Sequence, residues 1–222
     1  MAARAERRSF WTWGYVSDEP SDAERAEAAR GLSERIGAEV TPPAIPQTVD
    51  IELRKPRLEV PAALAGSVST EHVERVTHTY GGHSLELLRA MRGEFVDPPD
   101  AVAHPRNEAE LEATLEWCDR AGHAAMPYGG GTSVVWGVNA PADAEGAVTV
   151  DLDEMNSVLE VDDVSRAGRF QAGILGPDLE AALKAKGLTL RHYPQSFPWS
   201  TVGGWVATRS PGYTATKHPQ IY

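Results

Sequence analysis

Three consecutive glycines, Gly129–Gly131, lie at the centre of the segment Pro-Tyr-Gly-Gly-Gly-Thr-Ser, residues 127–133. Glycine has no Cβ, so the backbone here can take a positive φ and lie directly against another group. Consecutive amide N–H groups in such a turn bind anionic oxygens, and the hydroxyls of Thr132 and Ser133 add further donors. The segment predicts either a diphosphate-binding loop or a flexible surface loop, and the glycines alone favour neither.

Two common phosphate-binding motifs are absent from this loop. A P-loop ends in Gly-Lys-Ser or Gly-Lys-Thr, and no lysine lies near residues 127–133. The dinucleotide fingerprint G-x-G-x-x-G requires a glycine where Val134 stands. The loop is therefore typical neither of an ordinary NTPase nor of an ordinary nicotinamide-binding domain.

A second region of similar chemistry lies downstream, in residues 194–212. It offers several hydroxyl groups, and the pair Gly203-Gly204 again allows close approach of the backbone. Trp199 and Trp205 are able to pack against a flat ring system. A core strand and turn with incidental hydroxyls explains this region equally well.

The first hundred residues predict helices joined by an extended connector. The aromatic segment Ser9–Tyr15 is expected to pack on the body of the protein, because its large rings are unfavourable in water. A capping box at Ser21–Glu24 begins a helix that ends at Gly37. Recurring prolines predict an extended connector over residues 42–61. Residues 72–95 are expected to be helical, with an apolar face formed by Leu85, Leu87, Leu88 and Met91.

The remaining residues alternate strand and helix signals. Asn107 is expected to cap a helix that buries Leu111, Leu115 and Cys118 and ends at Gly122. A further helix begins at Gly176-Pro177 and ends at Gly187. Strands are expected at residues 101–104, 124–126, 147–152, 158–161, 169–171 and 188–193. This mixed order favours an α+β or α/β fold.

The charge and cysteine content limit the classes of partner. The chain has 222 residues and a net charge of -11, so nucleic acid and anionic membranes are not expected partners. Its apolar stretches are too short for a transmembrane helix, and no secretory signal is evident at the N-terminus. The single cysteine, Cys118, cannot form an intramolecular disulfide. A cytoplasmic location is the simplest expectation.

No metal site is predicted. His78 and His83 are five residues apart, which is not the spacing of a zinc helix, and solvated or capping roles are favoured. The acidic groups at residues 151–154 and 162–163 lack the pattern of a calcium loop, so exposed turn carboxylates are expected. Cys118 is interpreted as an inert core residue.

Taken together, these motifs resemble the FAD-linked oxidases of the vanillyl-alcohol oxidase type, which share a PCMH-type FAD-binding domain. Within that family the sequence is most similar to the alkyldihydroxyacetonephosphate synthases. The matching residues are Trp13-Gly14-Tyr15, Gly82–Leu85, Leu88, Arg89, Gly93, Pro127–Ser133, Pro141–Asp143, Met155-Asn156, Ala172–Ile174 and Ser200–Arg209. The last string, Ser-Thr-Val-Gly-Gly-Trp-Val-Ala-Thr-Arg, is the most specific.

The resemblance implies three contacts with FAD. They are formed by Pro127, Tyr128, Gly129, Gly130, Gly131, Thr132 and Ser133; by Gln195, Ser196, Phe197, Pro198, Trp199, Ser200 and Thr201; and by Thr208, Arg209, Ser210 and Pro211. Gln195 stands where an acidic residue is usual, and Pro211 replaces a small polar residue. Relatives with histidyl-linked flavin carry a histidine in the glycine loop, so non-covalent FAD is expected here.

The implied fold is α+β: a PCMH-type FAD-binding domain of two α/β subdomains with an N-terminal helical extension. The expected division is an N-terminal helical and extended segment, residues 1–93, followed by an incomplete FAD-binding domain, residues 94–222. The family's later flavin segment and its substrate-binding cap are not found before Tyr222. The chain is therefore expected to be truncated and inactive alone, and no catalytic residue is assigned.

The implied activity is exchange of an acyl group for a fatty alcohol on acyl-dihydroxyacetone phosphate, with no net redox change. Oxidation of a hydroxy acid or alcohol is the first alternative, and a non-catalytic flavin-binding fragment is the second. The expected ligand besides FAD is a small-molecule or lipid-like substrate, and a homodimer is possible.

Overall fold

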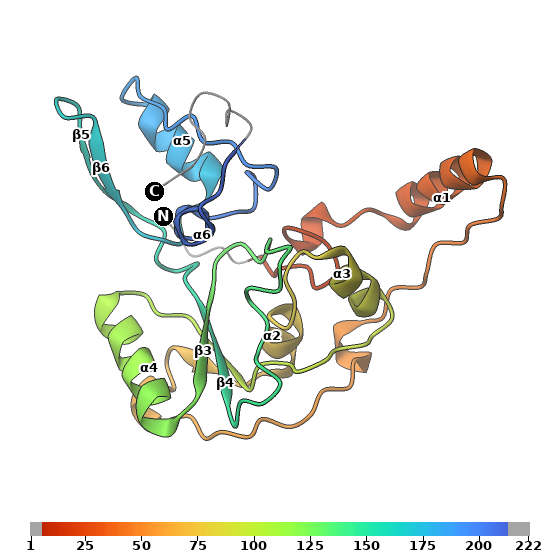
Figure 1. Ribbon diagram of the computed structural model, residues 1–222, viewed down its shortest axis with the longest axis horizontal. Coiled ribbons are helices and arrows are strands. Elements are labelled where there is room, and N and C mark those ends of the chain that lie inside the picture. Colours follow the sequence, from red (N-terminus) through yellow and green to blue (C-terminus); the bar gives the residue numbers. More distant parts are fainter. Residues whose placement is uncertain (1–5, 213–222) are drawn as a thin grey trace.

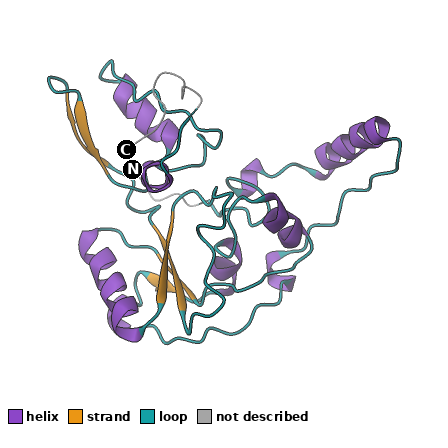
Figure 2. Cartoon of the chain, in the orientation of Figure 1, coloured by secondary structure: helices purple, strands orange, loops and turns teal. Residues whose placement is uncertain are grey.

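The computed structural model describes residues 6–212, which form helices around two separate sheets (Figure 1, Figure 2). The α-helices are α1 (Asp22–Ile36), α2 (His72–Thr77), α3 (Ser84–Met91), α4 (Glu108–Ala121), α5 (Gly176–Lys184) and α6 (Val202–Thr208). The strands are β1 (Val68–Ser69), β2 (Ala101–Ala103), β3 (Ala124–Tyr128), β4 (Ala147–Asp151), β5 (Val158–Asp162) and β6 (Ala167–Phe170). This content confirms the predicted α+β fold.

The larger sheet has the strand order β1-β2-β4-β3. Strands β2, β4 and β3 are parallel, and β1 joins β2 antiparallel. Helices α4 and α2 lie on opposite sides of this sheet (Figure 1). A parallel sheet covered on both faces has apolar strands throughout, and β4 is indeed buried along its whole length. Strand β1 of this sheet lies before residue 94, within the predicted N-terminal segment.

A smaller unit follows in the chain. Strands β5 and β6 form an antiparallel pair, and α5 and α6 lie beside it (Figure 1). Its core consists of Ile174, Leu179, Leu183 and Trp205. Two α/β units of this kind agree with the two subdomains that the sequence predicts.

Helix ends follow the predicted capping residues. At the start of α1 the Ser21 hydroxyl accepts a hydrogen bond from the Glu24 amide at 3.3 Å, and the Glu24 carboxylate accepts one from the Ser21 amide at 2.8 Å. Asn107 caps α4 in the same manner, accepting from the Glu110 amide at 3.0 Å. Gly37 and Gly122, both with a φ of 68°, end these two helices in the left-handed region.

The predicted proline-rich connector is confirmed, and Asp100 fixes its end to the larger sheet. This carboxylate is fully buried at the start of β2 and pairs with Arg54 and Arg57. It also accepts a hydrogen bond from the Ala147 amide at 2.9 Å, at the start of β4. The connector is therefore anchored at the amino ends of the parallel strands, whereas the glycine loop lies at their carboxyl ends.

The helical prediction for residues 72–95 is only partly correct. Two helices form, α2 and α3, and the chain between them turns at residues 78–83. The predicted apolar face is wrong, because Leu85 and Leu88 are half exposed whereas Glu86 and Ala90 are buried. Glu86 is buried because its carboxylate caps α3 at the His83 amide and accepts a hydrogen bond from Asn139.

Two further expectations are corrected. Leu115 is 45% exposed, and α4 instead buries Thr114, Trp117 and Cys118. Residues 188–193 form no strand, because Thr189, Leu190 and Tyr193 bind the buried Glu180 carboxylate of α5. Cys118 is a core residue as predicted, and burial raises the pKa of its thiol to about 11.

Among the described helices, none is both long enough and apolar enough to cross a membrane.

Candidate functional site

The glycine loop lies at the carboxyl edge of the larger sheet. Strand β3 ends at Tyr128, directly before Gly129, and β4 ends beside it at Asp151, the register partner of Tyr128. Ligands of open α/β sheets bind outside the carboxyl ends of the strands. The loop therefore occupies the edge where a ligand is expected.

Two glycines of the loop are required by its geometry. A Cβ at Gly130 would lie 1.7 Å from the carbonyl oxygen of Trp199, so no other residue fits without moving the backbone. Gly131 has a φ of 65°, and a Cβ there would lie 2.3 Å from the Tyr128 hydroxyl oxygen. The loop is thus packed directly against the turn that contains Trp199.

The first two predicted segments are brought together by this contact. The turn 195–199 leads into the buried residues Ser200 and Thr201, and Thr201 caps α6 by accepting from the Gly204 amide at 3.3 Å. Meanwhile, no backbone amide of residues 129–133 donates a hydrogen bond to another described residue. Polar backbone groups normally find a partner. Five consecutive amides without a partner among the described residues, in a loop packed against a second polar segment, suit a ligand with several anionic oxygens.

The tryptophans of the second segment have different roles. Trp205 is a core residue, 3% exposed, whose indole N–H donates to the Ser200 hydroxyl at 2.7 Å. Its ring stacks on Phe197, so it is not free to pack against a ligand, and that part of the prediction is wrong. Trp199 is partly exposed and donates to Asp18 at 3.1 Å.

The third predicted segment, Thr208–Pro211, lies at the far end of α6. Its Thr208 hydroxyl donates to the Gly204 carbonyl at 2.8 Å, and Ser210 binds His192 at 3.1 Å. Among the described residues, no hydrogen bond or ion pair joins this segment to the glycine loop. Helix α6 itself was not predicted, because a Gly-Gly pair is unfavourable inside a helix. Thr201 followed by an apolar stretch was the available signal.

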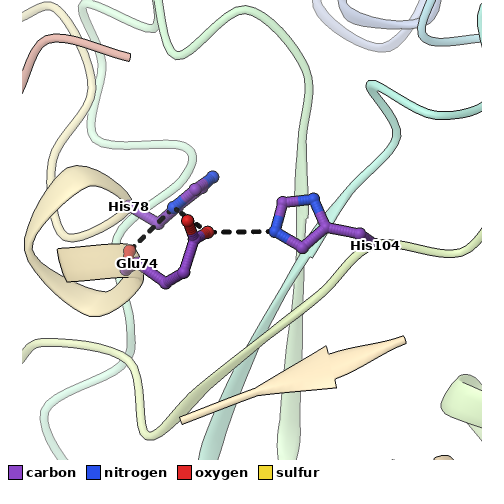
Figure 3. A group of neighbouring side chains, drawn as sticks. All are labelled: Glu74, His78 and His104. Atoms are coloured by element: carbon purple, nitrogen blue, oxygen red, sulfur yellow. Dashed lines mark hydrogen bonds and ion pairs between the residues drawn. The ribbon is translucent and has the colours of Figure 1, made fainter. Parts of the chain in front are cut away.

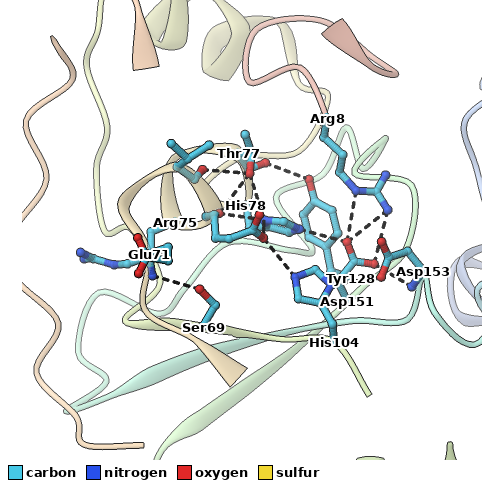
Figure 4. Close-up of polar contacts among 12 residues, drawn as sticks. Arg8, Ser69, Glu71, Arg75, Thr77, His78, His104, Tyr128, Asp151 and Asp153 are labelled. Atoms are coloured by element: carbon cyan, nitrogen blue, oxygen red, sulfur yellow. Dashed lines mark hydrogen bonds and ion pairs between the residues drawn. The ribbon is translucent and has the colours of Figure 1, made fainter. Parts of the chain in front are cut away.

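A buried ionic network lies beneath the glycine loop (Figure 4). The Asp151 carboxylate is completely buried and accepts two hydrogen bonds from Arg8, at 3.1 and 3.3 Å. It also lies 3.0 Å from Nε2 of His78, a ring that is 3% exposed. Burial alone would raise the pKa of Asp151, but the charge of Arg8 and the His78 hydrogen bond outweigh it and lower that pKa. Asp151 and Arg8 therefore form an ionised pair.

The network continues through His104, whose ring faces the Glu74 carboxylate (Figure 3) and binds Asp153 on its other side. Nε2 of His104 is 3.0 Å from Glu74 and Nδ1 is 3.1 Å from Asp153. Burial alone would lower the pKa of His104, but these two hydrogen bonds raise it to about 10. His104 is an imidazolium at neutral pH.

This network corrects two expectations. His78 is not solvated, but its predicted capping alternative is confirmed, because it ends α2 and its Nδ1 lies 2.7 Å from the Glu74 carbonyl oxygen. Asp151 is not an exposed turn carboxylate, because it is buried against His78. The capping role of His83 is confirmed, because its ring accepts from the Leu85 amide at 3.2 Å. Glu74, His78 and His104 lie within the distance of a shared metal ion. A metal would have to displace the proton of His104, so the donor set fits an ion-pair network better.

The charge of His104 predicts stability that is lost in alkali. A folded pKa of about 10, above the ordinary 6.5, means that the contribution is fully present below pH 6.5 and disappears as pH rises through about 10. His104→Gln should therefore lower the free energy of unfolding by about 2–3 kcal/mol at pH 6 and by much less at pH 10. Urea denaturation of the wild type and of His104→Gln at both pH values measures the difference in their free energy of unfolding. Groups that titrate in the same way in both proteins cancel from this difference. An equal difference at both would contradict the assignment.

Comparison with known proteins identifies the class to which this fold and site belong. Residues 99–221 match the FAD binding domain family, more than half of the chain. The chain belongs to this family, and FAD is the cofactor that its domain binds.

Several individual proteins are also similar to this chain. The alkyldihydroxyacetonephosphate synthase of Dictyostelium discoideum is 33% identical over 158 residues, 71% of this chain and 26% of that protein. A solved alkyldihydroxyacetonephosphate synthase structure superposes with a TM-score of 0.81 at 27% identity, covering 96% of this chain and 45% of the other. Glycolate oxidase subunit GlcD of Bacillus subtilis is 30% identical over 125 residues, 56% of this chain and 26% of that protein. The chain thus spans about a quarter of the length of these curated relatives.

Proposed function

We propose that this chain binds FAD non-covalently and forms the flavin-binding part of an enzyme of the alkyldihydroxyacetonephosphate synthase type. The observation that carries the proposal is the row of free amides at residues 129–133, packed against residues 199–201 at the carboxyl edge of the sheet. Main-chain donors without a Cβ suit a diphosphate, and the hydroxyls of Thr132 and Ser133 lie in the same loop. No histidine is present in this loop to form a covalent link.

The division of labour follows from these groups. FAD, when bound, supplies the reactive isoalloxazine. The glycine loop would hold the diphosphate, and the turn 195–201 would close over it from the second unit. Residues 208–211 are proposed as a third contact at the far end of α6.

For the whole protein we propose exchange of an acyl group for a fatty alcohol on acyl-dihydroxyacetone phosphate. A small-molecule or lipid-like substrate, a cytoplasmic location and a homodimer belong to the same proposal. Similarity to the glycolate oxidase subunit favours, as a second candidate, oxidation of a hydroxy acid. An assay of the full-length protein with both substrate classes distinguishes them.

Titration of the purified 222-residue chain with FAD tests the binding proposal. Saturable quenching of flavin fluorescence is expected, and denaturation should release all flavin into solution because no covalent bond holds it. Riboflavin, which lacks the diphosphate, should bind at least about tenfold more weakly, since the free amides would have no anionic partner. A well-folded chain that ignores FAD would overturn the proposal.

A further inference from the structure

We infer that residues 7–18, here called the aromatic loop, form part of the flavin site, with Arg8 as the residue that positions the glycine loop. These residues lie outside the matched family domain, residues 99–221. The inference rests on the proposed function, because it assigns a role in FAD binding. It also predicts a property of the chain without FAD, which is tested separately.

The aromatic loop contacts the second segment of the proposed site directly and the glycine loop through Gly82. The Trp13 indole N–H donates to the Gly82 carbonyl at 3.3 Å, and the Gly82 amide donates to the Ser133 carbonyl at 2.6 Å. On the other side, the Trp199 indole N–H donates to Asp18 at 3.1 Å, and its ring packs edge-on against Trp13. The aromatic loop thus bridges residues 129–133 and the turn 195–199.

The aromatic loop is itself held closed by its own backbone. The Ser9 amide donates to the Gly14 carbonyl at 3.1 Å, and the Val16 amide donates to the Arg7 carbonyl at 3.0 Å. Its first turn is fixed by the Ser9 hydroxyl, which accepts from the amides of Trp11 and Thr12. Because these hydrogen bonds close the aromatic loop, the position of Arg8 also fixes the position of the aromatic residues at the tip of the loop.

Arg8 connects this loop to the strand ends beneath the glycines (Figure 4). Its side chain is 10% exposed, forks onto Asp151 at the end of β4, and lies 5.5 Å from the centre of the Tyr128 ring. The Tyr128 hydroxyl points back under the glycine loop, where it donates to the carbonyls of Thr77 and Tyr80 at 3.4 Å. Asp151 and Tyr128 are register partners, so Arg8 fixes both strand ends that carry the loop.

A small enclosed cavity lies between the two loops. It is lined by Arg8, Thr12, Tyr128, Gly130 and Gly131 among others. The buried hydroxyl of Thr12 has no hydrogen-bond partner among the described residues. The aromatic loop therefore presents polar groups directly to the inner side of the glycine loop.

Hydrogen–deuterium exchange of the FAD-free chain tests the positioning role. Arg8→Met removes the charge and the fork, so exchange of the Gly82 and Leu152 amides, which donate to the Ser133 and Tyr128 carbonyls, should rise about tenfold or more, because the glycine loop and the end of β3 open locally. Arg8→Lys keeps a cation but loses the fork, so a smaller rise is expected. Arg120→Met is the matched control, because Arg120 lies on α4 with its side chain 70% exposed and forms only a surface ion pair with Glu116 among the described residues. Exchange in α1 and α5 should stay at the wild-type rate in every variant.

FAD titration of the same variants supplies the second measurement. The dissociation constant should rise about tenfold in Arg8→Met, less in Arg8→Lys, and not at all in Arg120→Met. If Arg8→Met does not fold, the exchange and FAD titration of Arg8→Lys test the inference. Exchange of the Gly82 and Leu152 amides at the wild-type rate in a folded Arg8 variant would overturn the inference. Failure of the wild-type chain to bind FAD would instead overturn the proposed function and leave the exchange result interpretable.

Discussion

Gly130→Ala is expected to reduce FAD affinity by at least about 100-fold, equivalent to roughly 2.7 kcal/mol of binding free energy. A methyl group at this position would lie 1.7 Å from the Trp199 carbonyl oxygen and 2.9 Å from the Ser200 Cα. Both neighbours are backbone atoms, so no side-chain rotation relieves the clash. The turn and the glycine loop must separate, and the two segments then cannot hold one diphosphate.

Gly31→Ala provides a matched control. Gly31 lies within α1, and a Cβ there meets nothing within 4 Å. Its FAD affinity should equal that of the wild type, and its free energy of unfolding should rise by about 0.5–1 kcal/mol because alanine favours the helix. Fluorescence titration and urea denaturation measure both effects. FAD binding by Gly130→Ala at wild-type affinity would show that the two segments do not act together.

Local signals in the sequence were sufficient for much of the fold. Ser21, Asn107, Gly37 and Gly122 begin and end their helices as capping chemistry predicts, because those interactions involve residues three or four apart. The glycine loop could also be located from its sequence, although its glycines alone did not distinguish a diphosphate-binding loop from a surface loop. Its packing against residues 199–201 could not be predicted, because that contact depends on how the two units are arranged.

Burial of charge was the part that sequence patterns predicted poorly. Asp151 was interpreted as an exposed turn residue, yet its partner Arg8 lies 143 positions away in the chain. One signal was available: Asp151 ends an apolar strand, at the same sheet edge as the glycine loop. The apolar face predicted to include Leu85 and Leu88 was wrong because α3 instead buries its capping carboxylate, Glu86.

The buried position of Asp151 means that loss of its charge should destabilise the fold strongly. Its carboxylate accepts from Arg8 twice and from the Asp153 amide at 3.0 Å, and it lies 3.0 Å from His78. Asp151→Asn keeps the shape but leaves the Arg8 guanidinium without a counter-charge in a buried site. The free energy of unfolding should fall by about 3–5 kcal/mol. Asp163→Asn, at an exposed ion pair with Lys186, should change it by less than about 0.5 kcal/mol.

The same carboxylate predicts how this difference varies with pH. The pKa of Asp151 is lowered below its ordinary value of 3.8, so its contribution is present above that value and is lost as pH falls through the folded pKa. Denaturation curves of the wild type and Asp151→Asn should therefore differ fully at pH 6 and converge in acid below pH 3.8. A difference that persists unchanged into strong acid would mean that packing, and not the charge of Asp151, holds Arg8 beneath the glycine loop.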